Sequence, residues 1–121
     1  MRLGIATGKS QRGVRILLER EGWAGLFATI QTADDAPSKP HPAMVRQAMA
    51  AVGAKPSDTV MVGDSTFDMA MARAAGATAI GVSWGYHRVE ALRETGAEAI
   101  VSSYAELRQA LASRLGTPDL V

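Results

Sequence analysis

Short apolar runs alternate along this chain with longer amphipathic stretches. Five runs have the length of strands, and they span residues 3–6, 26–30, 59–62, 78–82 and 99–101. The stretches that follow them carry apolar residues at helical spacing, and each ends at a glycine: Gly22, Gly53, Gly76, Gly96 or Gly116. This alternation predicts a three-layer α/β fold, in which a doubly wound parallel sheet with right-handed crossovers carries helices on both faces.

Composition limits the chain to one ordinary domain. Of its 121 residues, 47% are hydrophobic and 21% are charged, so we expect one domain over residues 1–116 and a tail over 117–121. The 13 basic and 12 acidic residues are interspersed, which predicts no nucleic-acid partner and no membrane partner. Without cysteine, disulfides and thiolate zinc sites are excluded, and no apolar run has the about 18 to 20 residues that cross a bilayer. We therefore expect a cytoplasmic protein.

The polar residues that follow the apolar runs are the candidates for function. Ligands of open α/β sheets bind outside the carboxyl ends of the strands, which is where these residues are expected to lie. Three sets stand out, one after each of the first three runs, and they lie in residues 7–10, 32–42 and 63–68.

The first set, Thr7-Gly8-Lys9-Ser10, matches the end of a nucleotide-binding phosphate loop. That motif requires a glycine five positions before its Gly-Lys pair, where this chain has Leu3, so a nucleotide-binding loop is disfavoured. What remains is a hydroxyl and backbone N–H groups at the start of a helix, which suit an anion such as phosphate. The alternative is that Thr7 or Ser10 only caps the helix, and the local sequence favours the cap.

The third set places two carboxylates at the end of a strand and in the first turn of the next helix. Asp64 and Asp68 are four residues apart and can face the same point. Mg²⁺ is commonly held by one or two carboxylates beside waters and a substrate phosphate, so the pair suits this cation. The alternative is a helix cap and a first-turn acid favoured by the helix dipole, and the local sequence leaves both interpretations open.

Lys39 lies in the proline-rich second set, directly before Pro40. A rigidly held ammonium beside carboxylates would neutralise charge that develops on a transferring phosphoryl group. The alternative is a solvated loop lysine, which is the commoner case for an isolated lysine. We expect His41 and His87 to be surface or positioning residues, and neither a base nor a metal ligand.

Taken together, the three sets resemble a known family. Residues 5–8, 39–42 and 62–68 resemble motifs two, three and four of the haloacid dehalogenase-like hydrolases, with the phosphoglycolate phosphatase-like group the most similar. Residues 72–76 and 81–86 resemble the usual continuation in that group. The resemblance implies the family's Rossmann-like core and a Mg²⁺-dependent phosphatase, or phosphoric monoester hydrolase, that acts on a small phosphorylated metabolite.

The resemblance also implies a role for each candidate residue. In such enzymes an aspartate attacks phosphorus, and water then hydrolyses the aspartyl-phosphate with Mg²⁺ present. Thr7 and the Gly8 N–H would hold phosphate oxygens, and Lys39 would pair with the phosphate and the attacking carboxylate. Asp64 would bind Mg²⁺ directly. Asp68 would support a metal-bound water or orient Lys39.

The family's first motif, D-x-D-x-[TV], does not occur in its expected place. Six residues precede Thr7 and none is acidic, and Asp34 and Asp35 fall at the wrong position. The chain therefore resembles the carboxyl-terminal core of a longer enzyme, lacking the nucleophile, the acid-base aspartate and the substrate-binding cap, and we expect it to be inactive alone.

A missing motif-one strand would leave the sheet incomplete at its centre, between the strands at 3–6 and 59–62. Orphaned backbone groups cost about 1–3 kcal/mol each, and exposed strand edges recruit partners. We expect these strands to pair directly, to exchange with another chain in self-association, or to meet the missing segment in trans.

Two other functions stay open at this point. One is a non-catalytic α/β module that binds phosphate or metal, or regulates, without a nucleophile. The other is a phosphoacceptor receiver-type domain, which would need an acidic pair after the first strand, where this chain has Thr7-Gly8-Lys9.

Overall fold

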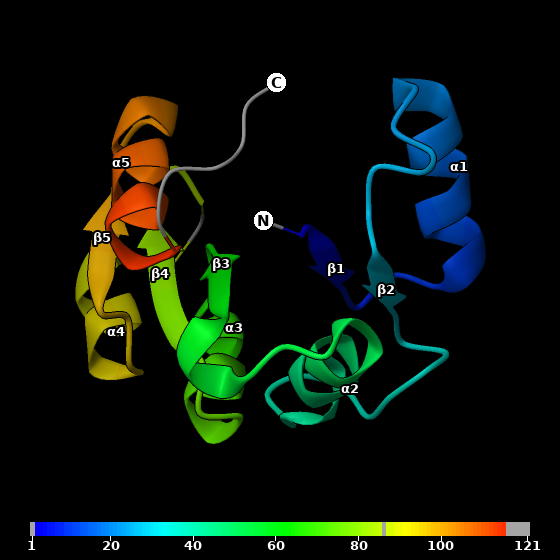
Figure 1. Ribbon diagram of the computed structural model, residues 1–121. Coiled ribbons are helices and arrows are strands. Elements are labelled where there is room, and N and C mark those ends of the chain that lie inside the picture. Colours follow the sequence, from blue (N-terminus) through cyan, green and yellow to red (C-terminus); the bar gives the residue numbers. More distant parts are fainter. Residues whose placement is uncertain (1, 86, 116–121) are drawn as a thin grey trace.

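The computed structural model describes residues 2–85 and 87–115 (Figure 1). Strands and helices alternate in these residues as the sequence predicts, with one short 3₁₀ turn. In chain order they are β1 (Gly4–Ala6), α1 (Gln11–Glu21), β2 (Thr29–Gln31), α2 (Ala43–Val52), η1 (Pro56–Asp58), β3 (Val60–Gly63), α3 (Thr66–Ala74), β4 (Thr78–Val82), α4 (Val89–Glu94), β5 (Ala99–Val101) and α5 (Tyr104–Leu115).

The second strand begins three residues later than its apolar run, at Thr29 instead of residue 26. Leu26 is 57% exposed and its N–H donates to the Trp23 carbonyl at 3.1 Å. Gly25, with φ of 87°, allows this turn, because a left-handed backbone carries little penalty at glycine. The start of the apolar run therefore forms the turn before β2.

The strands form two parallel groups. β1 pairs with β2, and β3, β4 and β5 pair in that order, so the predicted parallel pairing is confirmed. In the described residues β1 does not pair with β3, and Figure 1 shows the two groups apart from each other. Of the three outcomes expected for these strands, direct pairing does not occur. The sheet is interrupted at the place expected for the absent central strand.

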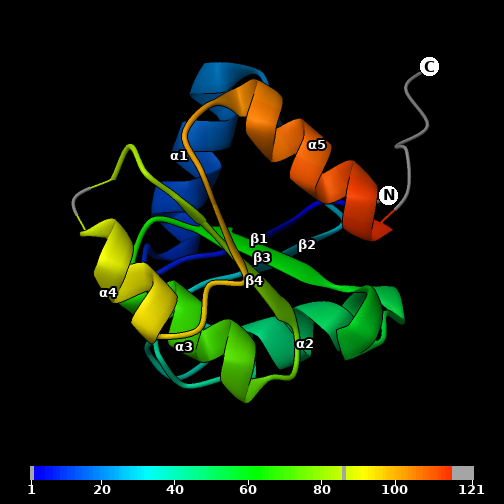
Figure 2. The same cartoon turned by 90° about the vertical axis from the view of Figure 1, so that its left-hand side faces the viewer.

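Helices cover both faces of the strands (Figure 2). α2, α3 and α4 lie on one face, where one buried cluster contains Met44 and Met49 of α2, Met69 and Met71 of α3, and Leu92 of α4. Because α2 packs on β1 and β2 while α3 packs on β3 and β4, this cluster joins the two groups of strands. Within residues 2–85 and 87–115 no strand pairing joins the two groups. This packing, together with a hydrogen bond from Arg46 of α2 to the Ala74 carbonyl of α3, holds them together.

The opposite face carries α1 and α5 (Figure 2). Ile80, Val82 and Val101 of the three-stranded sheet form a smaller buried cluster, against which Leu107 and Leu111 of α5 pack. The expected three layers are therefore present. No helix in residues 2–85 and 87–115 is long and apolar enough to span a membrane. The expected tail, 117–121, lies outside the described residues.

Candidate active site

The loops that follow β1, β2, β3 and β4 meet at one edge of the molecule. The loops after β1 and β2 are joined by the Ala33 N–H, which donates to the Lys9 carbonyl at 3.0 Å. The loops after β2 and β4 each contact the first turn of α3, through Lys39 Nζ to Asp68 Oδ1 at 2.5 Å and through the Thr66 N–H to His87 Nδ1 at 3.1 Å. Because the loops follow the carboxyl ends of parallel strands, this edge is where an open α/β sheet binds its ligands.

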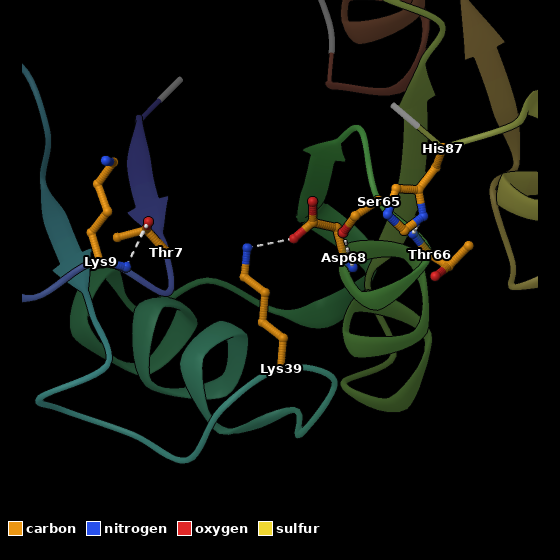
Figure 3. Close-up of polar contacts among 7 residues, drawn as sticks. All are labelled: Thr7, Lys9, Lys39, Ser65, Thr66, Asp68 and His87. Atoms are coloured by element: carbon orange, nitrogen blue, oxygen red, sulfur yellow. Dashed lines mark hydrogen bonds and ion pairs between the residues drawn. The ribbon is translucent and has the colours of Figure 1, made fainter. Parts of the chain in front are cut away.

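Lys39 and Asp68 form an ion pair that is largely removed from water. Their side chains are only 22% and 7% exposed. In Figure 3 the Lys39 side chain rises between Thr7 and Asp68 and its ammonium points to the carboxylate. Asp68 lies close over Gly63, where an added Cβ would come 2.5 Å from the Cβ of Asp68. Lys39 is therefore a held cation, and its interpretation as a solvated loop lysine is wrong.

Asp64 follows β3 but does not cap the next helix. Ser65 is the cap residue of α3, and its hydroxyl accepts from the Asp68 N–H at 3.1 Å. The Asp64 side chain is exposed, and its carboxylate accepts no hydrogen bond within residues 2–85 and 87–115. Since Ser65 does the capping, the carboxylate of Asp64 is available for a ligand.

Thr7 and Gly8 lie at the end of β1, on the other side of the interruption. The Thr7 N–H continues the pairing of β1 with β2 by donating to the Gln31 carbonyl at 3.0 Å, and Thr7 Oγ1 accepts from the Lys9 N–H at 3.2 Å. Ser10, whose hydroxyl accepts from the Gly13 N–H at 3.1 Å, caps α1. No hydrogen bond of the described residues joins Thr7 or Gly8 to Lys39, Asp64 or Asp68.

The carboxylates present suit a cation that takes few protein ligands. No group of three or more histidine, aspartate or glutamate side chains in the described part of the chain could hold a metal ion. Asp64 offers a free carboxylate, while Asp68 shares its charge with Lys39. Mg²⁺ fits this donor set, because it keeps several waters and needs only one or two carboxylates beside substrate phosphate oxygens.

Asp34 and Asp35 have a structural role that the sequence analysis did not identify. Asp34 Oδ2 accepts from the Gln11 N–H at 2.8 Å, at the start of α1. Asp35 Oδ2 accepts from the N–H and the hydroxyl of Thr32, at 2.9 and 2.7 Å, and from Gln11 Nε2 at 2.5 Å. The signal that could have revealed this role is the Thr32-Ala33-Asp34-Asp35 run after a strand, because such residues bond their own backbone in turns.

The hydrogen bonds to Asp35 make the stability of the fold depend on pH. The Thr32 hydroxyl, then Gln11 and the Thr32 N–H, hold the pKa of the Asp35 carboxyl below its ordinary value. The carboxylate is therefore stabilising above the unfolded pKa of about 3.9, and that contribution is lost as the pH falls through the lower folded value. We expect Asp35→Asn to lower the urea midpoint at pH 7, and the difference from wild type to shrink below about pH 4.

The matched control for this prediction is Asp58→Asn. Asp58 lies in the exposed turn η1, and within the described residues its carboxylate accepts no hydrogen bond. Urea unfolding of both variants at pH 7 and at pH 3.5 separates the two cases. A constant difference between Asp35→Asn and wild type at both pH values would contradict the assignment.

Comparison with known proteins identifies the family. The model of the haloacid dehalogenase-like hydrolase family matches residues 1–82. A probable phosphatase, IndB, of Dickeya dadantii is 41% identical over 106 residues, which cover 87% of this chain and 46% of that protein. A phosphoglycolate phosphatase of Rhodospirillum rubrum is 37% identical over 108 residues, which cover 88% of this chain and 44% of that protein.

A solved structure has the same architecture. The crystal structure of a protein described as a predicted phosphatase from Clostridium acetobutylicum matches 93% of this chain and 53% of its own, with a TM-score of 0.84 and 30% identity. The chain spans about half the length of the relatives it matches. The resemblance seen in residues 5–8, 39–42 and 62–68 is confirmed: the chain belongs to the haloacid dehalogenase-like hydrolases, in their phosphoglycolate phosphatase-like group.

Proposed function

We propose that this chain is the core of a Mg²⁺-dependent phosphatase that hydrolyses small phosphate monoesters. The observation that carries the proposal is the part-buried ion pair of Lys39 and Asp68 beside Asp64, whose carboxylate accepts no hydrogen bond from the described residues, at the ligand-binding edge of the sheet. We further propose that the enzyme acts in the cytoplasm, in the same compartment as its substrates, because doubly charged phosphate esters do not cross a bilayer unaided.

Each residue of the site has a task in this proposal. Asp64 holds the cation, and Asp68 fixes the Lys39 ammonium through their ion pair. Lys39 neutralises negative charge that grows on the phosphoryl oxygens as the ester bond breaks. The Thr7 hydroxyl and the Gly8 N–H hold two phosphate oxygens from the β1 side. Bound Mg²⁺ supplies further positive charge to the phosphoryl group.

The attacking group comes from outside these residues in our proposal. An aspartate oxygen forms a bond to phosphorus while the ester P–O bond breaks, and the leaving alkoxide takes a proton from the acid-base aspartate of the first motif. Water then gives a proton back to that aspartate and attacks the same phosphorus, which releases phosphate and restores the attacking carboxylate. No acidic residue of this chain occupies the motif-one position, so we propose that the chain alone is inactive and that a longer parent protein supplies the nucleophile.

The substrate class can be tested with the parent protein. We expect inorganic phosphate to be released from small monoesters such as phosphoglycolate and p-nitrophenyl phosphate, and no halide to be released from a 2-haloacid. The opposite result, halide release without phosphate release, would place the enzyme elsewhere in its superfamily. A folded parent protein that hydrolyses none of these esters would contradict the proposed function.

The interruption between β1 and β3 is proposed as the place where another strand binds. Within residues 2–85 and 87–115 no strand pairs with the facing edges of β1 and β3, and Val62 of β3 is 36% exposed. Because an exposed strand edge presents N–H and C=O groups that can pair with a further strand, a strand that fits between both edges would be stabilising. In the isolated chain we propose that a second copy supplies it.

Sedimentation of the isolated chain tests this proposal. We expect concentration-dependent dimers, and slower hydrogen exchange of the β1 and β3 amides in the dimer than at high dilution. Adding the amino-terminal half of the parent protein is expected to replace the dimer with a one-to-one complex. A stable monomer at every concentration, in which the β1 and β3 amides exchange their hydrogens freely, would contradict the proposal.

A further inference from the structure

The loop between β4 and α4 reaches back to the segment that carries Asp64 and Asp68. Its residue His87 accepts a hydrogen bond from the Thr66 N–H through Nδ1, at 3.1 Å and across 21 positions of sequence. The imidazole also packs edge-on against Phe67, with ring centroids 6.2 Å apart and planes at 70°. Figure 3 shows the ring directed at the first turn of α3.

This bond satisfies a group that the helix itself cannot satisfy. The first N–H groups of an α-helix have no acceptor within the helix. In α3, Ser65 accepts from the Asp68 N–H and His87 accepts from the Thr66 N–H. Two hydrogen bonds to acceptors outside the helix therefore hold the first turn of α3. Both are donated by backbone N–H groups in the stretch from Asp64 to Asp68, the two candidate cation ligands.

A second contact of the same loop constrains Asp64 itself. A Cβ added at Gly85 would lie 2.6 Å from Asp64 Oδ2, so the backbone of Gly85 lies directly against the carboxylate. Any larger residue at position 85 would displace the Asp64 side chain. Gly85 therefore limits the position of the Asp64 side chain on one side, and His87 holds the start of α3, which follows Asp64 in the chain.

We propose that His87 is a positioning residue that sets the affinity of the Asp64 site for Mg²⁺. The inference rests on the proposed function, because it takes Asp64 to be the cation ligand. His87 acts through the backbone of Thr66 and touches neither carboxylate in this assignment. Residues that orient metal ligands typically change metal affinity or activity by about 10- to 100-fold when they are replaced.

The chemistry of the bond predicts which replacements preserve the function. Nδ1 accepts only when the imidazole is neutral and its proton is on Nε2. Asparagine can present an acceptor oxygen near the Nδ1 position, whereas alanine has no acceptor. Glutamine carries its amide one carbon farther along the side chain. His87→Asn is therefore expected to retain the bond, and His87→Ala and His87→Gln to lose it.

The test compares these variants in the parent protein. We expect His87→Ala to raise the Mg²⁺ concentration for half-maximal phosphate release by about 10- to 100-fold, and His87→Asn to remain within a few-fold of wild type. If His87→Ala does not fold, His87→Gln takes its place. Hydrogen exchange of the Thr66 amide is measured alongside, and it should accelerate in the same variants that lose Mg²⁺ affinity.

Ser103→Ala is the matched control. The Ser103 hydroxyl also accepts from a backbone N–H at a helix start, that of Glu106 in α5, at 3.1 Å, and α5 lies on the face opposite α3. Losing this bond removes the same kind of contact at a helix that carries no residue of the proposed site, so the Mg²⁺ requirement should stay at the wild-type value. An equal rise in Ser103→Ala and His87→Ala would assign the effect to general destabilisation and overturn the inference.

The outcomes separate this inference from the proposed function. An unchanged Mg²⁺ requirement in folded His87→Ala overturns the positioning role, while the phosphatase itself stands. If wild-type activity needs no Mg²⁺, the proposed function fails, and with it the role of His87 in Mg²⁺ affinity. Hydrogen exchange of the Thr66 amide then tests only the hydrogen bond to His87. Faster exchange in His87→Ala and unchanged exchange in His87→Asn would establish that this bond exists.

Discussion

Asp64→Asn in the parent protein is expected to reduce Mg²⁺-dependent phosphate release by more than about 100-fold while leaving the fold intact. Asparagine keeps the shape of the side chain but removes the charge that we propose holds the cation. Losing a metal ligand should cost more than losing a residue that orients a ligand, which costs about 10- to 100-fold. Asp64 is exposed and accepts no hydrogen bond from the described residues, so the free energy of unfolding should change by less than about 0.5 kcal/mol.

The measurement pairs kcat/KM with thermal unfolding, and Asp58→Asn serves as the control. Asp58 is an exposed aspartate of η1, away from the strand ends that form the site, so its replacement should leave both quantities unchanged. Activity of Asp64→Asn near the wild-type level would show that the cation assignment is wrong.

Lys39→Met is expected to lower both turnover and stability. Methionine keeps an unbranched apolar stem without the charge. The variant therefore loses the cation that we propose neutralises the transferring group, at an expected cost of about 10²- to 10³-fold in kcat. It also leaves the buried Asp68 carboxylate, 5% exposed, without its ammonium partner. A buried group that loses its partner destabilises a fold by about 1–3 kcal/mol.

A double variant separates these two effects. Lys39→Met combined with Asp68→Asn removes both charges, so stability should recover in part while turnover stays low. Lys55→Met, at an exposed lysine next to η1, should change neither quantity. If Lys39→Met loses stability but keeps kcat, Lys39 serves the fold and has no part in the chemistry.

Most of the element order could be predicted because it depends on local patterns. Apolar runs of strand length and glycines at helix ends place β4 and β5 at their observed bounds. The error at β2 arose because Leu26 is apolar but lies in a turn that Gly25 allows, and periodicity does not report exposure. The break between β1 and β3 could not be read from periodicity at all, and its expectation came from the resemblance to a family.

The site could be predicted only as a set of separate candidates. Lys39 and Asp68 are 29 positions apart, and their contact depends on how α2 and α3 pack around one core. The local sequence left Asp64 open between a helix cap and a cation ligand, and only the hydrogen bond from the Asp68 N–H to the Ser65 hydroxyl shows that Ser65 is the cap. The sequence around a single loop histidine such as His87 contains no pattern that predicts its hydrogen bond to the Thr66 N–H.

The Mg²⁺ requirement of the parent protein tests the central claim most directly. Phosphate release from p-nitrophenyl phosphate is followed first with Mg²⁺, then after removal of divalent cations with EDTA, and then after Mg²⁺ is restored. We predict that release falls to background in EDTA and returns fully with Mg²⁺, because in our proposal the cation at Asp64 is needed to hold the phosphoryl group. Undiminished phosphate release by the metal-free protein would contradict the account.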